Sequence, residues 1–386
     1  MTNMTWNPKI LLLTGSYGNG HLKVTKTLKD MFLKLGVDQD NIVESDLYLA
    51  SHPILTKASK YLYIKSFTYG KKIYGFLYYG GSKNKRIVSY DFLNKYGMST
   101  MKQLVDEVKP DIIVNTFPML VVPEFRKRTG AQIPIVHVVT DYYAHKNWIH
   151  EEVDRYYVAT EQLKCDLMNQ GFSCEQIKVS GIPIDSIFEE EYDKQALFDA
   201  YQLDSSRPVV LIAAGAYGVL KDFDETMNKL LDGNRNQIMV VCGKNEELKN
   251  TLETRFVGNK NVVIFGYTNK MDELMKMATV MVTKPGGITL SEALAVQVPL
   301  ILYRPVPGQE KENALFFESK GAAIQVERPS LLLESILNLL EDEELRLSMK
   351  KSMKALYNEN SSEVICQDVL DIALYSDKEK MNRIIV

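Results

Sequence analysis

Short apolar runs alternate with amphipathic segments along nearly the whole chain of 386 residues. Each run has the length and the apolar content of a buried strand, and the segments between them have helical periodicity. The first half holds four such runs, at residues 9–14, 111–115, 135–140 and 156–159. The second half holds six, at residues 208–213, 237–242, 262–265, 280–283, 300–303 and 323–326. This alternation predicts a parallel α/β architecture.

The alternation breaks once, at "VSGIPIDSIFEEEY", residues 179–192. A strand ends there, turn residues and an acidic run follow, and strands restart near residue 208. We therefore predict two doubly wound, Rossmann-like domains that face each other across a cleft, at residues 1–184 and 185–360. No strand follows the last helical pattern, so residues 361–386 are expected to cross back and pack on the first domain.

Composition narrows the class of protein. Hydrophobic residues make up 45% and charged residues 25%, which is enough apolar content for a sizeable core. The net charge of -3 argues against a general nucleic-acid binder. The four cysteines are widely spaced and form no C-x-x-C pair, which favours reduced thiols over disulfides or a zinc site. We find no signal-peptide pattern and no apolar run of about 18 residues, so a soluble or peripheral protein is expected.

The first loop, in "ILLLTGSYGNGHLKVTKTLKDMF" (residues 10–32), predicts a strand, a glycine-rich turn and a helix from about Asn19 to Gly36. Gly15, Gly18 and Gly20 would let the backbone approach a ligand and adopt positive φ. The residues after Gly20 are not the Lys and Ser/Thr of a Walker A loop, so a magnesium-triphosphate site is not expected. The glycine spacing differs from the dinucleotide fingerprint, and no acidic residue lies at a convincing distance on a second strand.

A histidine, His21, stands at the start of this helix. An imidazole in an active cleft can take a proton from a hydroxyl group at neutral pH, but it can also simply cap the helix. Asp141, at the end of another strand, is a rival base, or it could orient His21 or bind the acceptor. The aromatic residues Tyr142, Tyr143 and Trp148 suit either a sugar-stacking surface or the core, and the residues alone leave that choice open.

The second loop lies in residues 283–323, where a tight turn, Pro285–Gly287, precedes a helix that starts near Thr289. The amino terminus of such a helix favours phosphate. Glu292, one turn further on, could accept hydrogen bonds from ribose hydroxyls, or it could merely complement the helix dipole. Polar groups suited to sugar hydroxyls follow at another helix start, and a third glycine turn spans residues 213–222. Three such turns suit a diphosphate-linked ligand such as a nucleotide sugar.

Four motifs together resemble glycosyltransferase family 28: "GSYGNGH", "VTDYYAHKNWI", "GIPI" and "KPGGITLSEAL" followed by "GQEKENA". Within that family the chain is most similar to the processive diacylglycerol beta-glucosyltransferases, over residues 9–356. The resemblance implies a GT-B fold and an inverting enzyme that moves glucose from UDP-glucose to 1,2-diacylglycerol. The product would be beta-diglucosyldiacylglycerol, a membrane glycolipid and lipoteichoic acid anchor, made without a cofactor. The alternatives are a UDP-N-acetylglucosamine 2-epimerase-like enzyme and a non-catalytic nucleotide-sugar sensor at the membrane.

The resemblance also implies residue roles. His21 would be the base, with Asp141 as the second catalytic candidate. The donor would contact Gly215, Tyr217, Gly218, Phe265, Pro285, Gly286, Gly287, Thr289, Glu292, Gln309, Glu310 and Asn313. The acceptor side would include Gly18, Tyr142, His145 and Trp148. The choice between glucose and galactose stays open at this stage and would be made by Gln309 and Glu310.

One position departs from the family pattern. Related sequences often have an arginine near the diphosphate after the "GxPI" segment, but this chain has Asp185. Lys221 and Lys244 are candidate substitutes by position only. No metal is expected: the two D-x-D strings, at residues 38–40 and 222–224, lie in a loop and in an early helix turn. His145 and His150 near Asp141 lack zinc-ligand spacing.

Residues 47–90 contain no Asp or Glu, but they contain eight Lys or Arg, eight Tyr and two Phe. Cations attract anionic lipid headgroups, and aromatic rings favour the membrane interface. The alternatives are a solvated basic face on a partly buried helix pair and a nucleic-acid surface. Because a nucleotide-sugar domain follows, we expect this segment, with Lys65, Lys71 and Lys72, to dock on the cytoplasmic face of the cell membrane and admit diacylglycerol.

Overall fold

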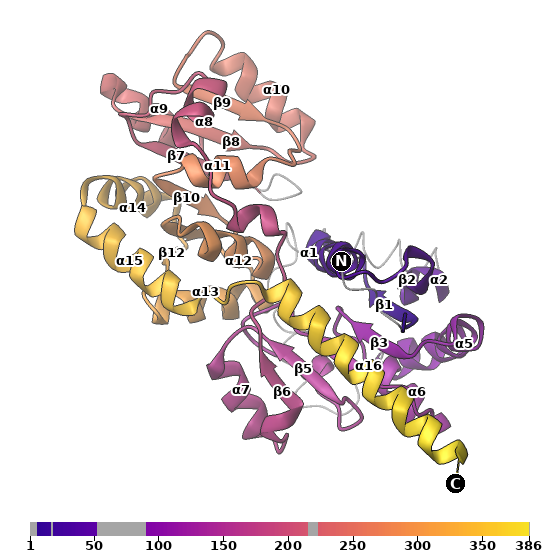
Figure 1. The fold of residues 1–386 in the computed structure, drawn as a ribbon. Helices are drawn as coiled ribbons and strands as arrows, with labels where there is room; N and C mark the ends of the chain where they lie inside the picture. The colour runs from indigo at the N-terminus through magenta and orange to yellow at the C-terminus, as the bar shows by residue number, and fades with distance from the viewer. Residues whose placement is uncertain (1–5, 17, 52–89, 215–222, 386) are drawn as a thin grey trace. The chain divides into compact units, whose positions relative to one another are not determined.

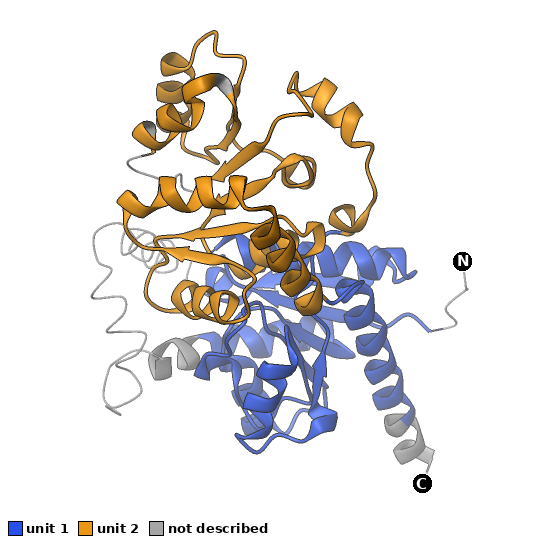
Figure 2. Ribbon diagram, turned by 90° about the vertical axis from the view of Figure 1, so that its left-hand side faces the viewer, with its two compact units in different colours: residues 1–185, 358–386 blue, residues 186–357 orange. Residues whose placement is uncertain are grey.

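A computed structural model describes residues 6–16, 18–51, 90–214 and 223–385 (Figure 1). The chain divides into two compact units, residues 1–185 with 358–386 and residues 186–357 (Figure 2). The first boundary falls one residue after the predicted one. Within these ranges, no helix combines the length and the hydropathy needed to cross a bilayer.

Unit 1 is built on a parallel sheet of six strands in the order β2-β1-β3-β4-β5-β6. The central strands are fully buried and rich in Ile, Leu and Val, as expected when helices cover both faces of a sheet. The strands are β1 (Ile10–Thr14), β2 (Ile42–Asp46), β3 (Ile112–Asn115), β4 (Ile135–Val138), β5 (Arg155–Val158) and β6 (Ile177–Val179). The helices are α1 (Asn19–Lys34), α2 (Leu47–Ser51), α5 (Tyr90–Val108), α6 (Val121–Thr129), α7 (Glu161–Met168) and α16 (Ser361–Ile385).

Unit 2 has a second parallel six-stranded sheet, in the order β12-β11-β10-β7-β8-β9. The strands are β7 (Val209–Ala213), β8 (Gln237–Val241), β9 (Val262–Phe265), β10 (Val280–Thr283), β11 (Leu300–Tyr303) and β12 (Ile324–Val326). The helices are α8 (Lys194–Ala200), α9 (Asp224–Leu231), α10 (Glu246–Arg255), α11 (Met271–Met277), α12 (Gly287–Val296), α13 (Gln309–Ser319), α14 (Pro329–Glu341) and α15 (Glu343–Leu356).

Each sheet reverses its strand order at one point, where consecutive connections leave in opposite directions. In unit 1 this point lies between β1 and β3, and in unit 2 it lies between β7 and β10. Ligands of doubly wound folds bind in the crevice outside the carboxyl ends of the strands at such a point. The loops singled out in the sequence, after β1 and after β10, therefore leave the sheets where the topology itself favours a ligand.

The predicted α/β fold is confirmed, and each of the ten apolar runs contains a strand whose ends lie within two residues of the prediction. The sequence reading missed β2 because its second half, Glu44 to Asp46, is polar. An edge strand has one unpaired side and tolerates such residues. It also named no bounds for β6, which has only three residues.

The last helix, α16, packs on unit 1 (Figure 1). It contacts α1 and β3, and the Cys366 thiol lies 3.6 Å from the carbonyl oxygen of Leu28. The carboxylate of Asp368 accepts hydrogen bonds from the Tyr157 hydroxyl at 2.7 Å and from the Lys178 ammonium at 3.0 Å. Both partners belong to strands at the same side of the sheet, so this carboxylate ties the end of the chain to β5 and β6.

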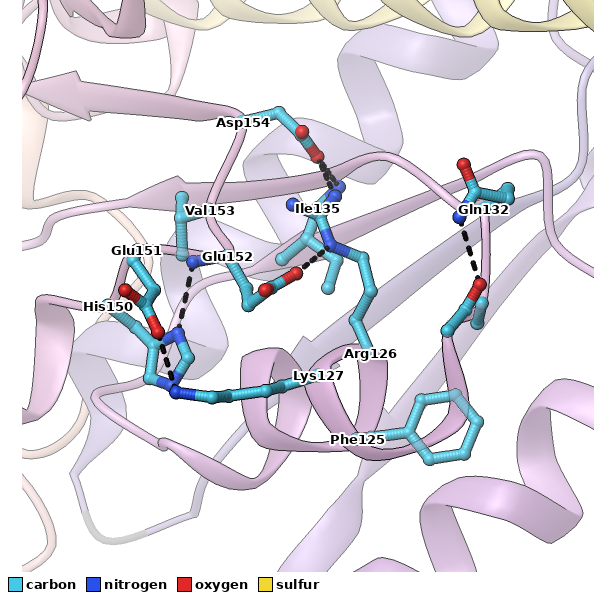
Figure 3. Close-up of polar contacts among 12 residues, drawn as sticks. Phe125, Arg126, Lys127, Gln132, Ile135, His150, Glu151, Glu152, Val153 and Asp154 are labelled. Atoms are coloured by element: carbon cyan, nitrogen blue, oxygen red, sulfur yellow. Dashed lines mark hydrogen bonds and ion pairs between the residues drawn. The ribbon is translucent and has the colours of Figure 1, made fainter.

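A network of ion pairs lies at the amino ends of β4 and β5 (Figure 3). Arg126 donates to Glu152 at 2.9 Å and also to Asp154, whose carboxylate accepts from the Ile135 backbone N–H. A pocket of about 790 Å³ lies against this network and against α16. It is at the opposite end of the sheet from the predicted site residues, and its Arg126 and Lys127 are already paired with carboxylates.

Candidate active site

His21 occupies the third position of α1, next to the end of β3. Its Nδ1 atom lies 2.8 Å from the carbonyl oxygen of Thr116 and 3.1 Å from the hydroxyl oxygen of Thr140. Thr116 directly follows β3, and Thr140 follows β4 by two residues. Three elements that are distant in sequence therefore converge on one side of one imidazole ring.

These contacts fix the tautomer of His21. A carbonyl oxygen can only accept, so Nδ1 must carry the proton that it donates to Thr116. Burial of the ring lowers the pKa of His21 to about 4, although the hydrogen bond to Thr116 acts in the opposite direction. The imidazole is therefore neutral at pH 7, with its lone pair on Nε2. That is the form in which a histidine can accept a proton from a hydroxyl group.

Aromatic rings enclose the imidazole. The Phe117 ring meets it edge to face, with centroids 4.8 Å apart, and the Trp148 ring lies at 6.4 Å. Phe117 also explains Gly15, because a Cβ added to Gly15 would lie 2.6 Å from the Phe117 ring. Non-bonded carbon atoms in proteins do not approach one another so closely, so only glycine fits there while Phe117 keeps its place beside His21.

Two expectations about this loop are wrong. Gly15, Gly18 and Gly20 do not have positive φ; Gly18 is the extended N-cap residue of α1, with φ of -153°. An acidic residue does lie on the second strand: the carboxylate of Asp46, at the end of β2, accepts a hydrogen bond from the Ser16 backbone N–H at 2.8 Å. Because this carboxylate holds the loop itself, it does not need a nucleotide ribose to explain its position.

The other predicted residues of unit 1 lie in the segment after β4. Asp141 is only 7% exposed and directly follows Thr140, the hydrogen-bond partner of His21. Trp148 is fully buried in the core of unit 1, which supports the core interpretation for this residue, and Tyr142 is buried as well. His145 accepts a weak hydrogen bond, at 3.4 Å, from the Asn147 backbone N–H and so caps a short 3-10 helix, Lys146–Trp148.

The predicted donor loop of unit 2 begins where β10 ends. A tight turn follows, in which the Gly286 N–H donates to the Lys284 carbonyl at 2.9 Å, and α12 then starts at Gly287. The predicted helix start near Thr289 is thus two residues late. A Cβ at Gly286 would meet nothing within 4 Å, so open space lies beside this helix terminus. Backbone N–H groups that face open space at the start of a helix favour an anionic ligand.

Polar side chains from α12 and α13 support this turn. Asn313 is 1% exposed, and its side-chain amide donates to the Pro285 carbonyl at 3.1 Å. Glu292 is 3% exposed on α12. Glu310 accepts a hydrogen bond from the Val306 N–H at 3.0 Å, which shapes the loop before α13. The structure therefore gives Asn313 and Glu310 a role in loop geometry, whatever they add to sugar binding.

The remaining donor candidates differ in their surroundings. Gln309 and Thr289 are partly exposed at the first turns of α13 and α12. Phe265 ends β9 at the edge of the sheet, and its ring packs edge to face on Tyr201, with centroids 5.7 Å apart. Gly215, Tyr217 and Gly218, together with Lys65, Lys71, Lys72, Lys221 and Asp222, lie outside the described residues, so their predicted roles stay predictions.

The sequence reading missed a cation at the donor loop. Lys284 is the first residue after β10 and lies one residue before the turn that opens α12, partly exposed. The rival Lys244 is exposed and lies over the Tyr267 ring, 5.9 Å from its centroid. The position of Lys284 was readable from "TKPGG" and from the predicted end of the strand at Thr283, which places this lysine in the loop. Among the described residues, no group of three or more metal-ligating side chains is placed to hold a metal ion.

Two family models match the chain, and together they cover most of both units. Residues 21–184 match the model of monogalactosyldiacylglycerol (MGDG) synthase, and residues 212–368 match the C-terminal domain of glycosyltransferase family 28. The chain thus belongs to glycosyltransferase family 28. The first model begins at His21, and the second includes the whole segment from Lys284 to Asn313.

Curated relatives give a finer assignment. The chain is 48% identical over 371 residues to the processive diacylglycerol beta-glucosyltransferase of Bacillus licheniformis, with 95% of this chain and 96% of the relative covered. It is 47% identical over 370 residues to the enzyme of the same name from Bacillus subtilis, with the same coverage. Within the family, the chain belongs with the processive diacylglycerol beta-glucosyltransferases.

Solved structures agree on the fold. Acinetobacter baumannii MurG matches with a TM-score of 0.62 and 12% identity, over 94% of this chain and all of that one. UDP-GlcNAc 2-epimerase from Neisseria meningitidis, bound to UDP-GlcNAc, matches with a TM-score of 0.60 and 14% identity, over 94% and 99%. At this identity the likeness shows the fold alone, which transferases and epimerases share.

Proposed function

We propose that the protein transfers glucose from UDP-glucose to the free hydroxyl group of 1,2-diacylglycerol, with inversion, and then adds a second glucose to its product. The observation that carries the proposal is the neutral His21 with a lone pair on Nε2, in a chain nearly half identical to enzymes of this name. The epimerase alternative is not favoured, because it rests on the fold alone.

In one displacement, the acceptor hydroxyl loses its proton to Nε2 of His21 while its oxygen forms a bond to the anomeric carbon of glucose. The bond between that carbon and the UDP oxygen breaks, and UDP leaves with the electron pair. UDP-glucose is an α-glycoside, so a single displacement gives a β-glycoside. The reaction requires a base and a leaving-group cradle on opposite faces of the anomeric carbon.

Unit 2 supplies the leaving-group cradle in this proposal. The first N–H groups of α12, which receive no capping hydrogen bond from an N-cap side chain, and the Lys284 ammonium would offset the growing charge on the diphosphate. Lys284 would thereby supply the positive charge of the arginine that related sequences often have where this chain has Asp185. Glu292 would accept from the ribose hydroxyls. Gln309 and Glu310 would contact the sugar, and these contacts would decide between glucose and galactose.

The proposal includes membrane docking, which is supported only by amino-acid composition, because residues 52–89 lie outside the described part of the chain. The eight cations and ten aromatic rings of residues 47–90 would bind an anionic leaflet on the cytoplasmic side, each cation contributing about 1 kcal/mol. Vesicle flotation tests this: charge reversal at Lys65, Lys71 and Lys72 should release the protein from anionic vesicles, and equal binding would contradict docking by this segment.

Product analysis tests the function itself. Purified protein is incubated with vesicles that contain diacylglycerol and with UDP-glucose or UDP-galactose labelled in the sugar. We expect lipid-soluble label from UDP-glucose, in mono- and diglucosyl products with β linkages. Conversion of a UDP-sugar to its epimer would establish the epimerase reading instead, and saturable binding without turnover would establish a sensor. Label transferred mainly from UDP-galactose would overturn the choice of donor.

A further inference from the structure

A buried chain of hydrogen bonds runs beneath the candidate base. Asn115 on β3 and His137 on β4 are register partners in adjacent strands, and both side chains are fully buried. The side-chain amide nitrogen of Asn115 lies 3.2 Å from Nε2 of His137. Nδ1 of His137 lies 2.9 Å from the carbonyl oxygen of Trp148, and the side-chain oxygen of Asn115 accepts from the Phe117 backbone N–H at 3.2 Å.

The donors and acceptors of this chain have one consistent arrangement. The Trp148 carbonyl can only accept, so Nδ1 of His137 carries a proton. Nε2 of His137 is then a lone pair and accepts from the Asn115 amide, whose oxygen is left for the Phe117 N–H. Burial lowers the pKa of His137 to about 4, which keeps the ring in this neutral form at pH 7. In this arrangement, both ring nitrogens of His137 and both the nitrogen and the oxygen of the Asn115 amide have a hydrogen-bond partner.

The two ends of the chain are backbone groups, the Phe117 N–H and the Trp148 carbonyl, and they belong to the two residues whose rings flank His21. Phe117 lies at one end and Trp148 at the other, with ring centroids 4.8 Å and 6.4 Å from the His21 imidazole. The bond from Phe117 N–H to Asn115 also closes a turn over Thr116. The carbonyl of Thr116 is the group that accepts from Nδ1 of His21. The shape of this turn therefore sets the direction of the carbonyl that fixes the His21 tautomer.

We infer that Asn115 and His137 are positioning residues, which hold the Thr116 carbonyl and the Phe117 and Trp148 rings so that His21 presents Nε2 to the acceptor hydroxyl. The inference rests on the proposed role of His21 as the base. A buried asparagine–histidine pair is costly to keep unless each group is paired, so one broken bond should disturb the whole chain.

Substitution of Asn115 separates this role from general stability. Asn115→Leu keeps the branched outline of the side chain, although it is somewhat larger, and removes both hydrogen bonds, whereas Asn115→Asp can still accept from Phe117 N–H. Its second oxygen can accept from a protonated His137, which also still donates to Trp148. The control is Tyr156→Phe. The Tyr156 ring packs on His137, with ring centroids 5.7 Å apart, but its hydroxyl group forms its hydrogen bonds with the His150 backbone, away from His21.

Two measurements on the full-length protein give independent readouts. The first is ¹⁵N NMR of histidine-labelled protein, which reports the tautomer of His21 among five histidines without any need for turnover. The second is glucosyl transfer, with kcat and the KM for UDP-glucose determined separately. If the protein proves not to be a transferase, the NMR measurement still tests the positioning role, so the two failures are distinguishable.

We expect Asn115→Leu to lower kcat 10- to 100-fold with KM changed less than twofold, and to give His21 a mixed tautomer. Asn115→Asp should retain kcat within about threefold, and Tyr156→Phe should keep both kcat and the tautomer. If Asn115→Leu does not fold, His137→Phe breaks the same chain and should give the same NMR change. Wild-type kcat and tautomer in either chain-breaking variant, or an equal loss in Tyr156→Phe, would overturn the inference.

Discussion

The Nδ1 atom of His21 lies 2.8 Å from the carbonyl oxygen of Thr116, a residue 95 positions further along the chain. One hydrogen bond thus joins the first helix of unit 1 to the end of β3, across the point where the strand order reverses. Since this bond uses Nδ1 as the donor, it leaves Nε2 as the basic atom. The chemistry proposed for unit 1 follows from that assignment.

Removal of the base should cost far more in turnover than in donor binding. His21→Ala should lower kcat by about 10²- to 10⁴-fold, the usual worth of a positioned base, with little change in the KM for UDP-glucose. His150→Gln is the matched control, since His150 pairs with Glu124 instead of with the Thr116 carbonyl. Steady-state kinetics on folded samples check this, and near-normal turnover by His21→Ala would remove the assignment.

The low pKa of His21 makes a prediction about the pH profile. The base should stay unprotonated down to about pH 4, so log(kcat/KM) should be flat between pH 7.5 and about pH 5.5, where an ordinary histidine would already titrate. A rate profile at constant ionic strength measures this. An acid limb with an apparent pKa near 6.5 would show that His21 is solvated in the working enzyme.

The lowered pKa of His137 predicts that the folded protein loses stability in acid. His137 has a folded-state pKa of about 4, below the ordinary value of 6.5, so the unfolded chain binds more protons between these values. Stability is therefore unaffected at pH 7 and falls as pH drops from about 6.5 toward 4, by on the order of 3 kcal/mol for this one group. Urea unfolding at pH 7 and pH 5 checks the sign, and His137→Phe should flatten the slope.

Gly15 offers a test of close packing. Gly15→Ala places a Cβ 2.6 Å from the Phe117 ring, so the ring must move away from its contact with His21. Overpacking of this kind costs about 1–3 kcal/mol, which should lower the melting temperature by several degrees. Gly18→Ala is the control, because a Cβ there meets nothing within 4 Å. Equal melting temperatures for the two variants would contradict the packing argument.

Lys284 can be tested against Lys244. Lys284→Gln should weaken UDP binding about 10- to 100-fold, as expected for the loss of a charged hydrogen bond to phosphate, and should reduce the dependence of binding on salt. Lys244→Gln should have a smaller effect, because that side chain lies exposed over Tyr267. Calorimetric titration with UDP measures both. A larger loss in Lys244→Gln would exchange the roles of the two lysines.

Much of this architecture could be predicted from local sequence. The apolar runs predicted the strands correctly. Buried parallel strands need continuous hydrophobic residues, and such runs can be recognised directly in the sequence. The exception, β2, is an edge strand whose polar half, Glu44 to Asp46, lacks that signal. The sequence also placed His21 and Gly286 correctly, in loops at the carboxyl ends of strands. A loop that directly follows a parallel strand must lie at that end of the sheet.

Side-chain roles that depend on distant partners could not be predicted in this way. Gly15 is required by Phe117, Asp46 holds Ser16, and His137 bonds Asn115 and Trp148; no pattern within a single segment contains these pairs. The sequence by itself determined two doubly wound sheets and the position of the loops proposed to carry chemistry, because burial and turn geometry are local. Only the tertiary structure decided that Trp148 is a core residue and which nitrogen of His21 is basic, because both depend on groups that folding brings together.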